Sequence, residues 1–191
     1  MKYTKIPSTA FQTLQLGAGI LLRSFDPATA EITEGSLLGA TTGGVDFSAK
    51  PSFSDFGEDI DNCPKNMAEL KRLDAWEAEL SGTFVTIDPA LAQRLLGSAD
   101  TDGPKITPRN DLVSGDFTEI WWVGDYSDRN SDASGGYVAI HLKRALSTDG
   151  FQLKTGDKSK GSFPFAFTAH YTMQDQDEVP FEIYVQAGEE S

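Results

Sequence analysis

The chain has 191 residues, of which 39% are apolar and 24% charged, and its formal net charge is −13. This length allows one large domain around a single core, and the acidic balance disfavours a positively charged groove for nucleic acid. A single cysteine excludes an internal disulfide framework, and the absence of a leader-like segment or a membrane-length apolar run leads us to expect a soluble protein with no membrane contact.

Residues 1–35 lack a regular hydrophobic period, yet residues 14–22 are mostly apolar and end ahead of Asp26 and Pro27. An apolar segment that cannot build its own core usually docks on the same domain or on a neighbouring copy. We therefore interpret residues 1–35 as an N-terminal arm with one short strand, and residues 36–191 as a single β-domain.

A strand is predicted next, where Val45 and Phe47 alternate with Asp46 and Ser48. The glycines at residues 39–44 indicate that the chain enters this strand through a tight turn. The sheet begins here.

A long acidic connection is predicted over residues 51–66, where Phe53, Phe56 and Ile60 are interleaved with carboxylates. Compact domains seldom keep a structureless loop of this length unless the loop binds a partner or orders on assembly. We interpret this segment as a docking loop.

Residues 70–84 alternate with the two-residue period of a half-buried strand. Trp76, Leu80 and Phe84 share the face expected in the core. The polar face of the same strand carries Glu77, Glu79, Ser81 and Thr83.

A short helix is predicted over residues 89–96. Asp88 can accept hydrogen bonds from the free amides of the first turn, a proline at the first helical position costs no hydrogen bond, and Gly97 allows a left-handed stop. The apolar stripe consists of Leu91, Leu95 and Leu96, and the side expected to face solvent carries Gln93 and Arg94.

After a polar connection over residues 98–112, a strand is predicted at residues 116–123. This strand is apolar on both faces, which indicates that it is covered on both sides, in part by another subunit. Trp121 and Trp122 point to opposite faces, so we expect one of them in the core and the other at an interface.

Three further strands are predicted over residues 137–145, 163–173 and 181–186. The turn signal at residues 148–150 predicts a hairpin from the first of them to residues 151–153. The residues expected to face the core are Phe163, Phe165, Phe167, Tyr171 and Met173 in the second strand, and Phe181, Ile183 and Val185 in the last. Together the elements predict a mainly β fold, a β-sandwich or partial barrel with one short flanking α-helix.

Catalytic and metal-binding patterns are weak. Asp128, Asn130 and Asp132 match the first ligands of a calcium loop, but alanine stands where that loop needs its glycine and its final carboxylate. His141 and His170 have no ligand at metal-binding spacing, and no serine or cysteine lies in an activating context. We expect no enzyme activity, no metal and no cofactor.

Charge is segregated along the chain, with acidic residues 55–61 and a basic turn that carries Lys154, Lys158 and Lys160. Placed at opposite ends of the molecule, these segments would suit head-to-tail stacking of identical copies. Two solvated loops explain the same pattern equally well.

Several stretches, taken in order and with their spacing, carry a family resemblance that covers nearly the whole chain. They are residues 38–45 (LGATTGGV), 55–64 (DFGEDIDNCP), 81–84 (SGTF), 160–161 (KG), 170–171 (HY) and 180–184 (PFEIY). The chain resembles the major tail tube proteins of long-tailed bacteriophages of Gram-positive hosts and their prophages.

The resemblance implies a tail-tube-like fold of two packed sheets with a flanking helix, shared with the tubes of contractile tails and of the type VI secretion system. It implies hexameric rings that close a β-barrel around a lumen and stack into a tube. The partners it implies are other copies of the chain, a tape-measure protein, tail terminator and distal tail proteins, and DNA that passes without specific binding. The location it implies is the virion tail, after assembly in the host cytoplasm.

A tube that conducts DNA should avoid basic contacts to phosphate, because each such contact gains free energy from counterion release. We therefore expect Glu77, Glu79, Ser81 and Thr83 to line the lumen. The residues expected at contacts between subunits are Leu14, Leu16, Ile20, Leu21, Phe53, Phe56, Asp59, Ile60, Lys154, Lys158 and Lys160.

Two alternatives share these features. A tube subunit of a phage-tail-like bacteriocin or of a secretion system would have the same sequence pattern. A carbohydrate-binding β-sandwich module would need exposed, coplanar aromatic side chains.

Overall fold

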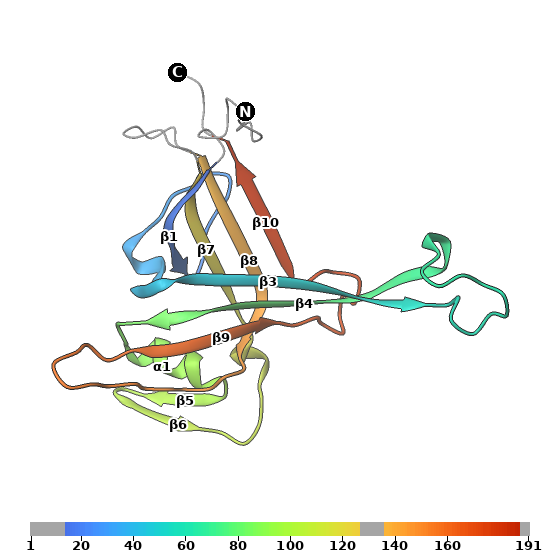
Figure 1. Ribbon diagram of the computed structural model, residues 1–191. Coiled ribbons are helices and arrows are strands. Elements are labelled where there is room, and N and C mark those ends of the chain that lie inside the picture. Colours follow the sequence, from blue (N-terminus) through green and yellow to red (C-terminus); the bar gives the residue numbers. More distant parts are fainter. Residues whose placement is uncertain (1–13, 127–135, 188–191) are drawn as a thin grey trace.

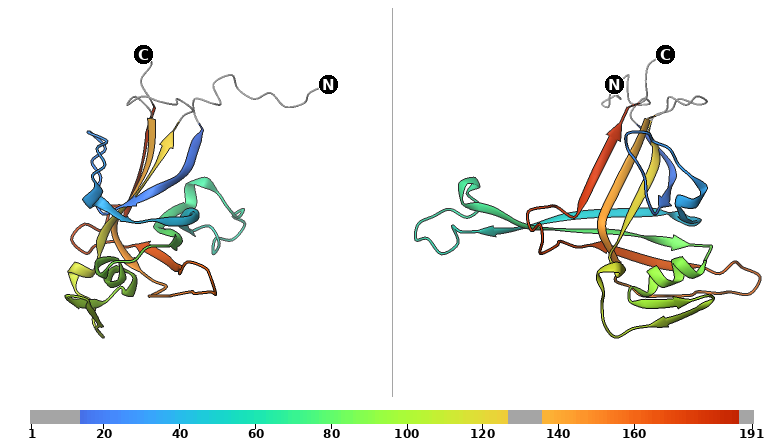
Figure 2. Two further views of the ribbon diagram at one scale, coloured as in Figure 1. Left: turned by 90° about the vertical axis from the view of Figure 1, so that its left-hand side faces the viewer. Right: turned by 180° about the vertical axis from the view of Figure 1, so that it is seen from behind.

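A computed structural model describes residues 14–126 and 136–187 and shows a mainly β fold with one α-helix (Figures 1 and 2). The predicted fold class is confirmed. The strands are β1 (Gln15–Leu22), β2 (Leu37–Gly39), β3 (Thr41–Asp55), β4 (Lys71–Phe84), β5 (Ala99–Asp102), β6 (Lys105–Pro108), β7 (Thr118–Tyr126), β8 (Gly136–Ser147), β9 (Phe163–Ala169) and β10 (Phe181–Gln186). The helix is α1 (Pro89–Leu96).

The large antiparallel sheet has the order β2-β1-β7-β8-β9-β4-β3, with β10 paired to β8. β1 lies between β2 and β7, so the predicted short strand of residues 1–35 belongs to the main sheet. β8 pairs first with β10 and then, through Ala145 to Ser147, with β9. The sheet therefore divides at β8 into two layers, which cross at a steep angle in Figure 1.

The main core fills the space between these two layers. One layer contributes Leu21 and Trp122, and the other contributes Leu80, Phe84 and Phe165, with the Phe84 and Phe165 rings 4.5 Å apart between centroids. This burial confirms that β4 alternates between a core face and a polar face.

The helix α1 closes one end of the core with its two fully buried leucines, Leu91 and Leu95. Asp88 caps it as predicted, because its Oδ1 accepts a hydrogen bond from the Leu91 amide at 2.6 Å. Gly97 ends it with φ of 76°. The prediction that Gln93 and Arg94 face solvent was wrong, since both are half-buried and donate hydrogen bonds to other elements.

A second apolar cluster covers the other face of β7. Trp121 packs there with Leu22 and Phe25, whereas Trp122 belongs to the main core. The strand is covered on both sides, as predicted, but this chain supplies the cover itself. The expectation of one interface tryptophan was wrong, because Trp121 and Trp122 are only 4% and 9% exposed.

β3 and β4 form a long hairpin that projects well beyond the two layers (Figures 1 and 2). The predicted loop over residues 51–66 was wrong at its start, because β3 continues through Pro51 to Asp55. Pro51 is tolerated since β3 is the outermost strand of its layer, where a missing N–H costs no ladder hydrogen bond. The connection at the tip is correspondingly shorter.

Predictions for residues 98–112 and 148–153 also fail. The polar connection contains the small hairpin β5–β6. Residues 151–153 form no strand, because the end of β8 pairs with β9 instead. Long-range pairing thus overrides a local turn signal.

The last two strands differ from expectation in what they bury. β9 ends at Ala169, which leaves Tyr171 and Met173 outside it, and Met173 is 91% exposed. β10 has the predicted bounds, but Ile183 and Val185 are 52% and 60% exposed rather than inside. The reason is that β10 extends past the layer that would cover it (Figure 1).

Candidate assembly surfaces

We call the distal half of the β3–β4 hairpin, residues 51–75, the arm; it is distinct from the N-terminal arm predicted over residues 1–35. Its apolar side chains have little to pack against, and Phe53, Phe56 and Ile60 are 56%, 59% and 52% exposed. Leu73 and Met67 are also exposed. Several exposed large apolar side chains on one projecting segment are typical of a contact with another protein.

The arm tip is held by polar contacts. Asp55 accepts hydrogen bonds from the amides of Gly57 at 2.9 Å and Asn66 at 3.0 Å. These bonds favour the ionised carboxylate and hold the pKa of Asp55 below its usual value. The tip therefore keeps a defined shape without a core of its own.

The arm tip also carries three exposed carboxylates, Glu58, Asp59 and Asp61. Across the described residues, none of them takes part in an ion pair. The basic turn with Lys154, Lys158 and Lys160 is exposed as well. It lies at the opposite end of the molecule from the arm in Figure 1.

The four residues expected in a lumen share the outer face of β4. Glu77 and Glu79 are exposed, whereas Ser81 and Thr83 are half-buried. Across the hairpin, Glu77 pairs with Lys50 in register, and these two side chains line a shallow depression with Ser48 and Glu79. The face is polar, and Lys50 places a basic group beside the two glutamates.

The predicted contact residues near the N-terminus differ in how far they are buried. Leu14 and Leu16 are exposed, and Ile20 is half-buried. Leu21 is fully buried in the main core, so its prediction as a contact residue is corrected: it has no surface for a neighbour. The cause is that the N-terminal strand β1 pairs with β2 and β7 inside the main sheet.

A charged cluster that sequence reasoning missed lies across β7, β8 and β10. The His141 ring stacks on Trp121 with centroids 3.8 Å apart and planes 7° apart. Its Nε2 lies 3.1 Å from Glu119 Oε2, and its Nδ1 lies 3.7 Å from Glu182 Oε2. Burial lowers the pKa of His141, although the two carboxylates act in the opposite direction.

Ion pairs continue this cluster along β8. Lys143 Nζ contacts Glu178 at 3.0 Å and Glu182 at 2.7 Å, and Arg144 contacts Glu178 at 2.7 Å. The hydrogen bonds to the basic groups lower the pKa of both glutamates. The pairing of β8 with β10, together with the segment just before β10 that carries Glu178, brings these residues together, and the sequence alone does not reveal it.

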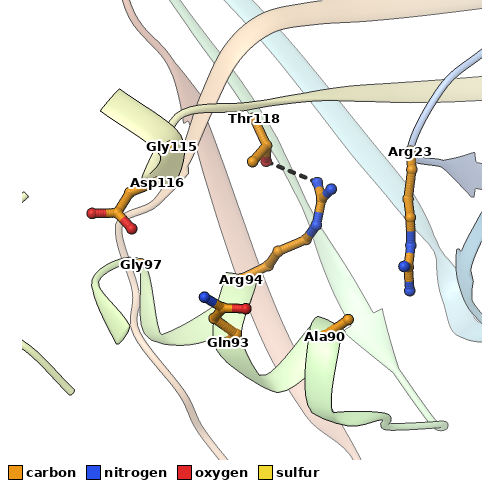
Figure 3. Close-up of a pocket in the computed structure, with 8 residues that line it drawn as sticks. All are labelled: Arg23, Ala90, Gln93, Arg94, Gly97, Gly115, Asp116 and Thr118. Carbon is orange, nitrogen blue, oxygen red and sulfur yellow. Dashed lines mark hydrogen bonds between the residues drawn. The ribbon is translucent and has the colours of Figure 1, made fainter. Parts of the chain in front are cut away.

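A small cavity of about 200 Å³ lies between α1 and the start of β7 (Figure 3). Arg94 enters it from the helix and donates from Nη1 to Thr118 Oγ1 at 2.8 Å. Arg23 enters it from the segment after β1, and its Nη2 lies 3.2 Å from Asp88 Oδ2. The sequence does not predict this cavity, because the helical pattern places Arg94 on the solvent side of the helix.

No group of three potential metal ligands occurs within the described ranges, 14–126 and 136–187. The calcium-loop candidates Asp128, Asn130 and Asp132 lie outside these ranges. In the same ranges, no helix is long and apolar enough to cross a membrane. The buried tryptophans leave no tryptophan platform for sugar rings at residues 121 and 122.

Comparison with protein-family models finds no match for this chain, and comparison with curated proteins finds none either.

Proposed function

We propose that this chain is the subunit of a self-assembling tube, of the kind that forms the tail of a long-tailed bacteriophage and conducts DNA into the host. In this proposal, copies form hexameric rings, and the rings stack into a tube. Its other partners are the tape-measure, tail terminator and distal tail proteins.

The observation that carries the proposal is the arm. A hairpin that leaves the body and exposes Phe53, Phe56 and Ile60 has a cost in solvation unless another surface covers it. The carboxylates at its tip, which form no ion pair with any described residue, and the basic turn at the far end of the molecule favour a head-to-tail contact between copies.

Free strand edges add support. In the large sheet, β3 and β10 each pair on one side only among the described strands. An unpaired edge is a template for another strand, and pairing between subunits would satisfy it. The exposed Ile183 and Val185 on β10 would be covered in the same step.

The outer face of β4 supports the conduit role. Glu77 and Glu79 give it negative charge, which lowers the affinity of a wall for phosphate. We place this face in the lumen. Density from cryo-electron microscopy that put these residues on the outer wall would contradict that placement.

Negative-stain electron microscopy of the purified protein across a concentration series tests the proposal. We expect rings or hollow tubes of uniform width that become more frequent as concentration rises. Small particles of one size at every concentration, also in the presence of a tail initiation complex, would contradict it.

A bacteriocin or secretion tube would give the same images. Neighbouring genes separate these cases, because a tape-measure gene together with a capsid gene indicates a phage.

A further inference from the structure

Two arginines, Arg23 and Arg94, and one carboxylate, Asp116, line the cavity between α1 and β7. Asp116 lines it but is committed to Arg109 and to the Val113 amide. Asp88 caps the helix and pairs with Arg23. Within the part of the chain that the structure describes, Arg94 forms no ion pair.

The two arginines also keep hydrogen-bond donors free. Arg23 Nε is buried and has no hydrogen-bond partner among the described residues. Among the described residues Arg94 donates only from Nη1, so its Nε and second terminal nitrogen remain for a ligand. Burial and the neighbouring charge of Arg23 lower the pKa of Arg94, although Glu119 and Asp88 act in the opposite direction. Both observations describe a site that an anion would stabilise.

The shape of the cavity fits a small oxyanion. Ala90, Gly97 and Gly115 contribute no bulky side chain to its lining, and Figure 3 shows the small Ala90 side chain below those of Arg23 and Arg94. A volume of about 200 Å³ exceeds the space of several waters, at roughly 30 Å³ each. A carboxylate can bind a guanidinium in a bidentate manner.

We propose that this cavity, the Arg23–Arg94 pocket, binds a carboxylate from the arm tip of a second copy of the chain. The inference rests on the proposed self-assembly and names one contact within it. The candidate ligands are Glu58, Asp59 and Asp61, which are exposed and unpaired in the described structure.

Geometry and charge favour a second copy as the source of the carboxylate. The arm tip and α1 lie at opposite ends of the molecule in Figure 1, so a tip cannot reach its own pocket. Two copies with a net charge of −13 each repel at long range. A local basic pocket that receives a local acidic tip overcomes this repulsion and sets the direction of assembly.

A disulfide test uses the native Cys63, which lies in the arm tip. In an Ala90→Cys variant, mild oxidation should join copies into a ladder of covalent oligomers on a non-reducing gel. Adding Cys63→Ser should abolish the ladder, and Lys105→Cys, on β6, should not form it. No ladder at any protein concentration, or an equal ladder from Lys105→Cys, overturns the inference.

A double-mutant cycle tests the charge in this contact. Arg94→Gln should raise the concentration at which copies associate at least 10-fold, and so should a tip variant with Glu58→Gln, Asp59→Asn and Asp61→Asn. The combination should have no further effect. Arg23→Gln is the second pocket variant in case Arg94→Gln fails to fold. Independent, multiplying effects would overturn the inference.

Acetate tests whether the pocket takes its carboxylate from the arm of a second copy or from a free anion in solution. Millimolar acetate should weaken association of the wild type and leave Arg94→Gln unchanged. Acetate that binds the pocket without affecting association would overturn the second copy as its source. Tubes without the ladder would refute only this inference, whereas a ladder of open chains without a lumen would refute only the tube.

Discussion

Both halves of the β3–β4 hairpin are paired strand, with a register shift between Ser52 and Phe53, but their surroundings are opposite. Near the body, Leu80 and Phe84 of β4 are fully buried against the crossing layer. In the arm, Phe53 and Leu73 are 56% and 45% exposed, although they belong to the same two strands. The same two strands therefore supply both buried and exposed apolar side chains, and the tertiary cover decides which of them belong to the core.

The difference in burial separates residues that stabilise the fold from residues that join one copy to another. Changes near the body should alter the free energy of unfolding, and changes in the arm should alter the affinity between copies. Substitutions in the body and in the arm test this division from its two sides.

The largest expected effect on stability comes from Phe165→Ala. Phe165 is 2% exposed and packs on Phe84 and Phe167, so its removal leaves a cavity and should cost about 3–5 kcal/mol. Urea unfolding followed by circular dichroism measures this change. The matched control is Phe56→Ala in the arm, and an equal loss there would contradict the division.

The helix cap gives the next largest effect. Asp88→Ala removes the bond to the Leu91 amide and the ion pair with Arg23, and should cost about 1 kcal/mol. Asp88→Asn keeps an acceptor at the cap and should restore most of this stability in the same unfolding assay. An Asn variant as unstable as the Ala variant would show that the ion pair, rather than the cap, is what matters.

Lowering the pH should reduce the free energy of unfolding, because His141 in the β7–β8–β10 cluster becomes protonated. Burial holds its pKa below the ordinary value of 6.5, so the unfolded state binds the proton more readily than the folded state. This contribution is full above about pH 6.5 and is lost as the pH falls. The urea midpoint should drop between pH 7.5 and 5.5, and His141→Gln should remove that dependence. A midpoint that rises on acidification would refute the assignment.

Arm substitutions should have the smallest effect on stability. Phe56→Ser and Ile60→Ser change side chains that are more than half exposed, so together they should shift the free energy of unfolding by no more than about 0.5 kcal/mol. Thermal and urea unfolding at low protein concentration measure this shift. A loss as large as that of Phe165→Ala would mean that the arm packs on its own body.

Local signals predicted the elements that depend on local chemistry. The helix bounds follow from Asp88, Pro89 and Gly97, and the core face of β4 follows from its alternation. Features that depend on long-range pairing were missed. The turn at residues 148–150 did not reveal that β8 pairs with β9, and the exposure of Ile183 depends on where the opposite layer ends.

The candidate sites show the same limit. Acidic and apolar residues in the arm were recognised from their interleaving in the sequence. The Arg23–Arg94 pocket and the His141 cluster were not, because each joins side chains from elements far apart in the chain. The residues that meet are decided by pairing between strands far apart in the chain and by the crossing of the two layers.

Sedimentation velocity of the wild type and of the Phe56→Ser, Ile60→Ser variant, over the same concentration range, shows whether the arm joins the copies. We expect the wild type to grow into large species with rising concentration, while the folded variant stays a monomer at concentrations at least 10-fold higher. Equal association of the two proteins would contradict the claim that the arm joins one copy to the next.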